Sequence, residues 1–147
     1  KIKFSEISSK HFGTLIQSFN EKSKKYEKTN DILIEKGQKI PASETRDYYT
    51  MHEGQEALNC TVTESNSNET DPNFVYVKWK GKLKFPPGRE KNQRIDITFG
   101  YDENKIMNCS FLDVESNKKI EVDLTEDTNN EGKDTDQEVD IDQFIVE

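Results

Sequence analysis

The residue types that most often carry chemistry are few in this chain and lie far apart in its sequence. Its two histidines, His11 and His52, are accompanied by no Cys-x-x-Cys, no His-x-x-x-His and no carboxylates at ligand spacing, so we expect no built-in metal site. The adjacent acids Asp102 and Glu103 lie in a short polar stretch, which favours turn formation over general acid–base catalysis. With no glycine-rich phosphate loop and no Gly-x-Ser-x-Gly elbow, the sequence indicates a binding module, with no catalytic residues and no enzyme activity of its own.

The two cysteines, Cys60 and Cys109, both alternate with polar neighbours, as strand residues do. Two cysteines are too few for a disulfide scaffold, so we expect two buried thiols in a reducing compartment. This expectation, together with the absence of a visible targeting signal, favours a cytoplasmic location.

A row of lysines alternates with apolar residues between positions 74 and 85. Lys78, Lys80, Lys82 and Lys84 flank Trp79 and resemble a basic stacking platform for nucleic acid. The alternative is a solvent-facing strand whose lysines discourage edge-to-edge pairing. We favour the second interpretation, with no nucleic-acid partner, because no aromatic RNA-binding motif accompanies the lysines.

The segment from 94 to 124 predicts a β-meander, since its apolar residues recur with a period of two. Short polar stretches separate the three apolar runs, as expected of turns between antiparallel strands. The apolar positions are Ile95, Ile97, Phe99 and Tyr101, then Met107, Cys109 and Phe111, and finally Ile120, Val122 and Leu124.

The whole chain predicts an all-β fold, an antiparallel sandwich of about eight short strands. The expected strands span residues 12–19, 31–35, 46–52, 57–64, 74–80, 94–101, 106–112 and 119–124. Residues 20–30, which are polar and basic, are expected to project as a loop from the first hairpin. Residues 64–73 and 86–93 are expected to form two further loops, the last because its two prolines exclude a central strand.

Charge divides the chain into a neutral body and an acidic tail. Of the 147 residues, 125–147 hold nine acids and one lysine, whereas the other residues hold 20 acids and 20 bases, so the formal charge of −8 belongs to the tail. We therefore expect a leader at 1–11, a sandwich at 12–124 and an acidic, disordered tail at 125–147. A chain that opens on Lys1 is expected to be a fragment of a longer protein, and no apolar run is long enough for a membrane span or signal peptide.

Ordered landmarks across residues 9–124 resemble the β-sandwich substrate-binding domain of Hsp70 chaperones. The family pattern L-I-x-(K/R)-N-x-x-I-P is matched first, followed by the patterns that end in D-N-Q, in P-A-P-R-G and in V-S-A-x-D. The matching residues are Leu33, Ile34, Lys36, Ile40 and Pro41; Tyr48, Thr50 and Gln55; Gly81, Leu83, Phe85, Pro86 and Arg89; and Ile95, Ile97, Thr98, Phe99, Asp102, Ile106, Ser110 and Asp113. The acidic tail stands where the family has its helical lid, so the resemblance is to a lidless domain.

This resemblance implies a cleft that holds extended, apolar segments of unfolded polypeptides through main-chain hydrogen bonds, with one central hydrophobic pocket. It also implies that ATP and J-domain co-chaperones would act on an ATPase domain upstream, and that this fragment itself takes no cofactor. Carried over by position, the peptide-binding residues are Tyr48, Leu58, Cys60 and Ile95 in the pocket, Met51 at the arch that closes over the peptide, and Thr14 on the opposite wall.

Two other hypotheses stay open at this point. The first is an Hsp110-like or degenerate relative, in which the sandwich is a structural or regulatory interaction module. The second is a β-sandwich that binds nucleic acid through its lysine-bearing strand, whose binding would weaken steeply with salt. The apolar residues Phe144, Ile145 and Val146 add the hypothesis that the tail docks into the chain's own cleft.

Overall fold

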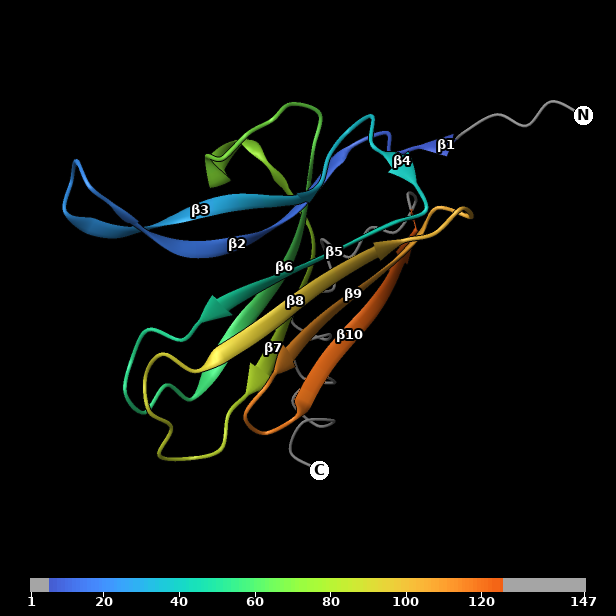
Figure 1. The fold of residues 1–147 in the computed structure, drawn as a ribbon. Helices are drawn as coiled ribbons and strands as arrows, with labels where there is room; N and C mark the ends of the chain where they lie inside the picture. The colour runs from blue at the N-terminus through green and yellow to red at the C-terminus, as the bar shows by residue number, and fades with distance from the viewer. Residues whose placement is uncertain (1–5, 126–147) are drawn as a thin grey trace, which may run out of the picture.

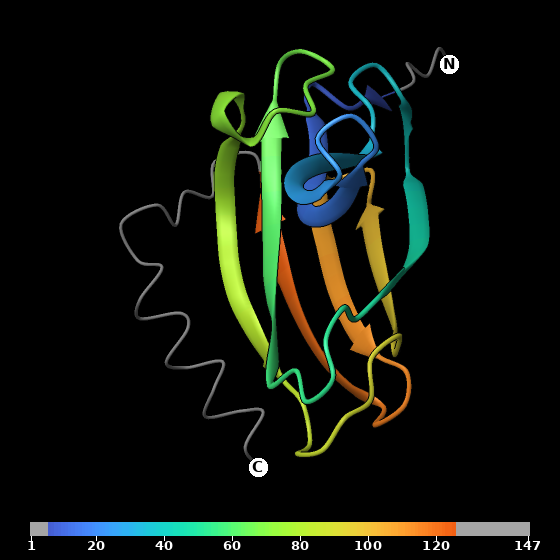
Figure 2. The same ribbon diagram turned by 90° about the vertical axis from the view of Figure 1, so that its left-hand side faces the viewer.

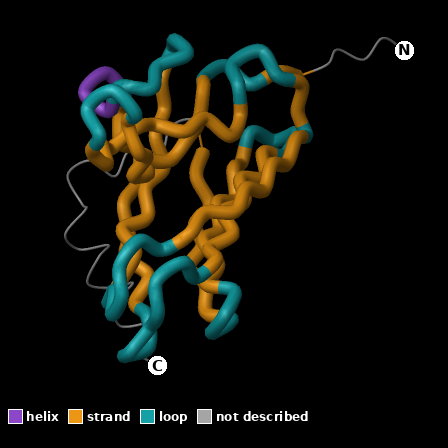
Figure 3. Tube along the Cα trace, turned by 60° about the vertical axis from the view of Figure 1, so that its left-hand side comes forward, coloured by secondary structure: helices purple, strands orange, loops and turns teal. Residues whose placement is uncertain are grey.

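The computed structural model describes residues 6–125, which form two antiparallel sheets packed face to face (Figure 1). One sheet has the strand order β3-β2-β6-β7 and the other has the order β10-β9-β8-β5. This arrangement confirms the predicted all-β sandwich. Among the described residues, the short 3₁₀-helix η1 (Pro72–Phe74) lies in the connection before β7 (Figure 3).

Residues 6–125 form ten strands, two more than predicted, because two short strands have no clear sequence pattern. β1 (Glu6–Ile7) and β4 (Lys39–Ile40) have two residues each and pair with one another. The first large sheet is built from β2 (His11–Asn20), β3 (Lys25–Ile34), β6 (Ala57–Ser65) and β7 (Tyr76–Lys84). The second is built from β5 (Ala42–Tyr49), β8 (Arg94–Tyr101), β9 (Ile106–Asp113) and β10 (Lys118–Thr125).

The core lies between the two sheets and is built from the alternate, inward-facing residues of each strand. Phe99 and Phe111 are fully buried and meet edge to face, with ring centroids 6.5 Å apart. Trp79 of the opposite sheet stacks on Phe111 at 6.0 Å. Rings that cross the interface in this way bury large apolar areas, so they fix how the two sheets sit on one another.

The predicted meander of β8, β9 and β10 is confirmed, and β8 has the expected bounds. Its first turn is stabilised by Asp102, whose Oδ1 accepts hydrogen bonds from the amides of Asn104 and Ile106, both at 2.9 Å. Lys105 in this turn has a positive φ of 61°. The adjacent acids of the sequence therefore serve turn formation at Asp102, as the polar stretch predicts.

The prediction of a loop over residues 20–30 is wrong for most of its length. Residues 25–30 continue β3, which pairs with β2 out to Asn20 and Lys25, so the two strands form a long hairpin that projects from the sandwich (Figures 1 and 2). Its outer half shows no apolar period because neither face there packs on the core. At its tip Phe19 and Tyr26 meet edge to face at 5.3 Å.

The lysine-bearing strand also departs from its prediction. β7 begins at Tyr76 rather than at residue 74, and Phe74 belongs to η1. Lys78 is not solvent-facing: it is 2% exposed, and its Nζ lies 3.4 Å from Glu64 Oε1. The pairing of β6 with β7 shifts between Val62 and Thr63, which leaves Lys78 as the extra residue of a bulge.

Both cysteines lie in the core as free thiols, in agreement with the expectation of buried small hydrophobes. Burial raises the pKa of Cys60 and Cys109 well above the usual thiol value. Thiols of this kind stay protonated at neutral pH and react slowly.

Residues 6–125 lack two features that would mark other classes of protein, a membrane-spanning helix and a cluster of metal ligands. Within this part of the chain, no helix has the length and apolar character of a membrane span. The same residues hold no group of three or more histidine, cysteine or acidic side chains placed to bind a metal. The predicted tail after Thr125, including Phe144, Ile145 and Val146, lies outside the described residues.

Candidate binding cleft

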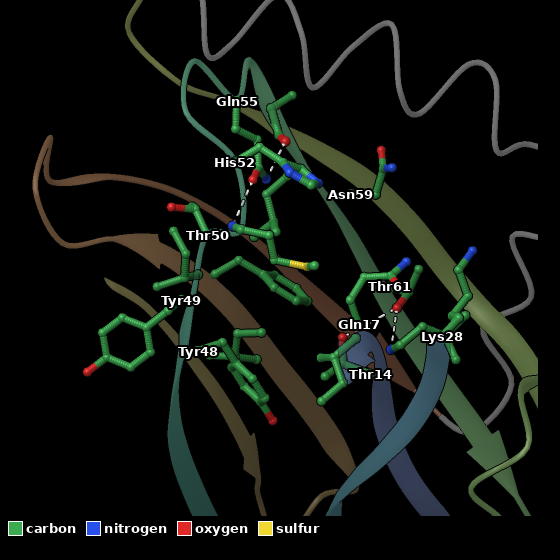
Figure 4. A pocket seen from close by; sticks show the side chains of 18 residues that line it. Thr14, Gln17, Lys28, Tyr48, Tyr49, Thr50, His52, Gln55, Asn59 and Thr61 are labelled. Carbon is green, nitrogen blue, oxygen red and sulfur yellow. Dashed lines mark hydrogen bonds between the residues drawn. The ribbon is translucent and has the colours of Figure 1, made fainter. Parts of the chain in front are cut away.

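A cavity of about 470 Å³ opens between the two sheets, beside the base of the projecting hairpin (Figure 4). The hairpin of β2 and β3 forms one side, and β6 forms the other. The connection from β5 to β6, residues 50–56, contributes Met51 and Gln55, and we call this connection the arch loop. Ile95, Ile97 and Phe111 of the second sheet form an apolar floor.

The cavity exists because β2 and β6 pair only at one end. Their backbone pairing covers His11 to Gly13 on β2, opposite Thr63 to Ser65 on β6. Beyond that point β2 pairs with β3 alone, and residues 57–62 of β6 pair with β7 alone. Both strands therefore present a backbone edge at the cavity that pairs with no other strand among residues 6–125. Such an edge carries N–H and C=O groups in the spacing that suits an added extended chain.

A side chain holds the two strands at the point where they separate. The Oγ1 atom of Thr61 accepts a hydrogen bond from the Leu15 amide at 2.8 Å and lies 3.3 Å from Thr14 Oγ1. Thr61 thus replaces one missing backbone hydrogen bond between β2 and β6. The contact fixes the base of the hairpin and with it the width of the cavity.

Asp31 of β3 links the projecting hairpin to β5 of the second sheet. Its carboxylate accepts a hydrogen bond from the Tyr48 hydroxyl at 2.5 Å and one from Arg46 Nη1 at 3.0 Å, so it joins β3 to β5. Burial, and then the hydrogen bond to Asp31, raises the pKa of Tyr48 well above its usual value. The hydroxyl therefore stays a donor at physiological pH. With its oxygen held by Asp31, Tyr48 contributes to the lining of the cavity.

The close approach of β2 to β3 at the base of the hairpin requires a glycine at position 13, which is Gly13. A Cβ atom at this position would lie 2.3 Å from the carbonyl oxygen of Asp31. No Cβ contact is that short without a shift of backbone, so only glycine lets β2 approach β3 here.

The arch loop is held by one of its own side chains. Gln55 Oε1 accepts a hydrogen bond from the Met51 amide at 3.1 Å, and Gln55 Nε2 donates to the Ala57 carbonyl at 3.1 Å. A second contact comes from the neighbouring loop 86–93, where the Arg89 carbonyl accepts a hydrogen bond from the Gly54 amide. These bonds hold the arch loop in place where Met51 lines the cavity.

A buried ion pair anchors loop 86–93 in turn. Arg89 donates from both terminal nitrogens to the carboxylate of Asp113, at 2.5 and 2.8 Å, and its guanidinium carbon lies 4.9 Å from the centre of the Phe85 ring. The side chains are 8% and 0% exposed. Burial alone would raise the pKa of Asp113, but hydrogen bonds from Arg89 and Ser116 outweigh it and lower the pKa below the usual value. The ion pair joins loop 86–93 to Asp113, the last residue of β9, and Arg89 in turn holds the arch loop through its carbonyl.

The structure brings together five of the six residues predicted to bind peptide. Thr14, Tyr48, Met51, Leu58 and Ile95 all line the cavity. Cys60 does not line the cavity. It lies two residues after Leu58 on β6, is 2% exposed and packs in the core. The role of these residues in binding a peptide stays a prediction.

Sequence reasoning missed part of the lining. Gln17 and Lys28 face the cavity from the hairpin, and Figure 4 shows Gln17 and Lys28 on the same side of it as Thr14. Lys28 falls within residues 20–30, whose polar sequence predicts a loop, and Gln17 lies in the outer part of β2, where no apolar period marks an inward face. The pairing of β2 with β3 places Gln17 directly opposite Lys28.

The arrangement combines an apolar floor, polar walls and two open strand edges. These are the features of a site for an extended, partly apolar chain rather than for a compact polar metabolite.

Comparison with protein families agrees with the resemblance in the sequence: the family model described as "Hsp70 protein" matches residues 23–144. This match covers most of the chain, and residues 6–125 form a β-sandwich that contains no α-helix. The chain therefore belongs to the Hsp70 family.

Proposed function

We propose that the cavity binds extended polypeptide segments with an apolar side chain at their centre, as the substrate-binding part of an Hsp70-type chaperone. The observation that carries the proposal is the pair of open strand edges on β2 and β6, which flank an apolar floor. An extended segment gains main-chain hydrogen bonds from such edges whatever its sequence. The floor of Ile95, Ile97 and Phe111 adds a preference for aliphatic side chains.

The predicted affinity is modest because a segment must lose its conformational freedom on binding. Main-chain hydrogen bonds and one apolar floor must offset that cost, so we expect a Kd in the micromolar range or weaker, about −8 kcal/mol. Family membership extends the proposal to unfolded polypeptides as substrates, to an ATPase domain elsewhere in the full protein with J-domain partners, and to a cytoplasmic location.

The test is a substitution on the wall of the cavity. Leu58 is half-buried and lines the cavity, so Leu58→Asp places a charge where an apolar side chain must sit. Titration of the protein into a fluorescent Leu-rich heptapeptide, followed by anisotropy at two salt concentrations, is expected to show saturable binding for the native chain. We expect Leu58→Asp to weaken that binding at least tenfold.

A matched control introduces the same charge elsewhere. Val114 is 42% exposed and does not line the cavity, so Val114→Asp is expected to bind as the native chain does. Circular dichroism of both variants reports whether the β-sandwich is intact. Unchanged binding by a folded Leu58→Asp variant would show that the peptide site lies elsewhere.

A further inference from the structure

The hairpin of β2 and β3 continues one wall of the cavity outward from the body of the sandwich (Figure 1). Gln17 of β2 pairs with Lys28 of β3 at the cavity, and two residues nearer the tip Phe19 pairs with Tyr26. Side chains two residues apart on a strand share a face. Gln17, Phe19, Tyr26 and Lys28 therefore form one continuous face of the hairpin, which we call the hairpin strip.

The backbone of β2 offers a continuous edge along the hairpin strip. The Leu15 amide donates to a side chain of β6 at 2.8 Å, so the peptide groups of Leu15 point away from β3. Asn30, which pairs with Leu15, donates its own amide outward to the Thr70 carbonyl at 2.8 Å. Because this direction alternates along a strand, Gln17 and Phe19 also present their N–H and C=O groups to the open edge. An extended segment in the cavity can therefore continue along β2 with the same main-chain pairing.

The outer end of the hairpin strip is aromatic and open to solvent. Phe19 and Tyr26 are 44% and 60% exposed, because neither ring reaches the core. Their edge-to-face contact holds the two rings against one another. Rings on one strand commonly pack on apolar side chains of the next strand in a sheet. The tip thus presents an apolar contact to a segment that follows β2.

The inner end of the hairpin strip is positively charged. Lys28 is the only charged residue of the strip, and among residues 6–125 no aspartate or glutamate lines the cavity. The two acids of β3, Glu27 and Asp31, point to the opposite face because they lie at odd-numbered positions. Hydrogen bonds hold both of them there, since Glu27 accepts one from Asn20 at 2.6 Å and Asp31 accepts two from β5. A segment that follows β2 therefore meets a positive charge as it leaves the cavity.

We propose that the hairpin strip reads one flank of the bound polypeptide segment. An acidic residue of the segment lies beside Lys28, and an aromatic or large aliphatic residue two positions further out lies beside Phe19 and Tyr26. The inference rests on the proposed function, since the central residue of the same segment occupies the cavity. The spacing of two follows from the register of an added strand, whose alternate side chains lie beside Gln17 and then beside Phe19. The strip makes the site selective in sequence, whereas main-chain pairing alone accepts any sequence.

The test compares peptides that differ only outside their central part. The Leu-rich heptapeptide is lengthened with Asp-Ser-Phe-Ser at its carboxyl end, or with Ser-Phe-Ser-Asp at its amino end, so that both directions of binding are covered. In anisotropy titrations of the full chain at low salt, we expect one of the two extended peptides to bind about fivefold tighter than the heptapeptide. Moving the Phe next to the Asp puts the two side chains on opposite faces and is expected to lose most of that gain.

The acidic residue is tested by reversing charge on both sides. With Lys in place of the Asp of the extended peptide, we expect the native chain to bind about threefold more weakly at low salt. At about 0.5 M NaCl most of that difference should disappear. Lys28→Glu is expected to reverse the order of the two peptides. Lys25→Glu, on the opposite face of the hairpin and outside the cavity lining, is the matched control and should keep the native order.

The aromatic pair is tested by a double substitution. Phe19→Ser together with Tyr26→Ser is expected to remove the gain from the peptide Phe, while the Kd of the heptapeptide stays within about a factor of two of the native value. Both side chains are exposed and lie outside the core, so we expect the circular dichroism of the variant to match that of the native chain.

The possible failures separate this inference from the proposed function. Saturable binding of the heptapeptide with no gain from either extension would overturn the role of the hairpin strip and leave the proposed function standing. A gain that persists in the folded double variant would place the flank of the segment elsewhere on the protein. Absence of binding by every peptide would contradict the proposed function, and this inference with it.

Discussion

At the scale of single residues, Arg89 and Asp113 carry the largest predicted effect on stability. The pair is buried and bidentate, so loss of one partner leaves the other charge without compensation. We expect Arg89→Met to lower the free energy of unfolding at pH 7 by about 3–5 kcal/mol, measured by urea denaturation. Arg94→Met is the matched control, because Arg94 pairs with Asp96 while 53% exposed and its loss should cost less than about 1 kcal/mol.

The sign of the pH dependence follows from Asp113. Its pKa is lowered in the folded protein, so the stabilisation is present above the unfolded value of about 3.9 and is lost as the pH falls through the lower folded value. In Arg89→Met, burial raises the pKa of Asp113 and the carboxyl takes up a proton at higher pH. The difference in unfolding free energy between native and variant is therefore expected to shrink from pH 7 to pH 3. A constant difference would contradict the role given to the ion pair.

Residue identity from sequence was enough to place five of the six predicted residues in the cleft, but it did not find the rest of the lining. Leu58 and Cys60 have the same inward direction by the period of two, and both lie where β2 has separated from β6, yet only Leu58 lines the cavity while Cys60 is buried in the core. The period of two identifies inward residues, but it does not show which of them the core covers. The separation of β2 from β6 is set by the side chain of Thr61 and by Gly13, neither of which has a distinctive sequence pattern.

At the scale of elements, the hairpin of β2 and β3 depends on one hydroxyl at its base. Thr61→Val keeps the shape of the side chain but removes the acceptor for the Leu15 amide. We expect a loss of about 1 kcal/mol in unfolding free energy and faster hydrogen exchange at the Leu15 amide, measured by NMR. We also expect weaker peptide binding, since the wall of the cavity becomes mobile.

A second threonine pair offers the control for that variant. Thr45 and Thr98 face one another across β5 and β8 with their hydroxyl oxygens 2.8 Å apart, and they lie away from the cavity. Thr45→Val is expected to leave Leu15 exchange and peptide binding unchanged. Equal effects of both variants would mean that Thr61 has no special role at the hairpin base.

The strands with one buried face were predictable, whereas those without one were not. β8, β9 and β10 alternate cleanly because one side of each packs on the core. Residues 25–30 form a strand that pairs with β2 alone and packs little on the core, so their polar sequence carries no period that distinguishes a strand from a loop. The burial of Lys78 was equally hidden, because a bulge interrupts the alternation on which the prediction relied.

At the scale of the whole molecule, charge is separated along the chain rather than spread over the fold. The sandwich is neutral as a whole, and the net charge of −8 lies beyond Thr125. Within the sandwich, the lysines of β7 gather on one face. The cleft lies on the opposite edge of β6 from β7. The acidic segment after Thr125 therefore carries the net charge of the chain, whereas the lining of the cleft carries one lysine, Lys28.

This separation predicts how the apolar end of the tail affects binding. Because the lining carries only Lys28 as a lysine, the acidic segment gains little charge attraction there, and we expect Phe144, Ile145 and Val146 not to occupy the cavity. Phe144→Ser, Ile145→Ser and Val146→Ser together, in the full chain, should leave the Kd for the Leu-rich heptapeptide within a factor of two, measured by anisotropy. If these residues instead compete for the cavity, their replacement should tighten peptide binding severalfold, because a tethered competitor at millimolar effective concentration would have been removed. Leu58→Asp in the same background serves as the reference, since it should weaken peptide binding at least tenfold in either case.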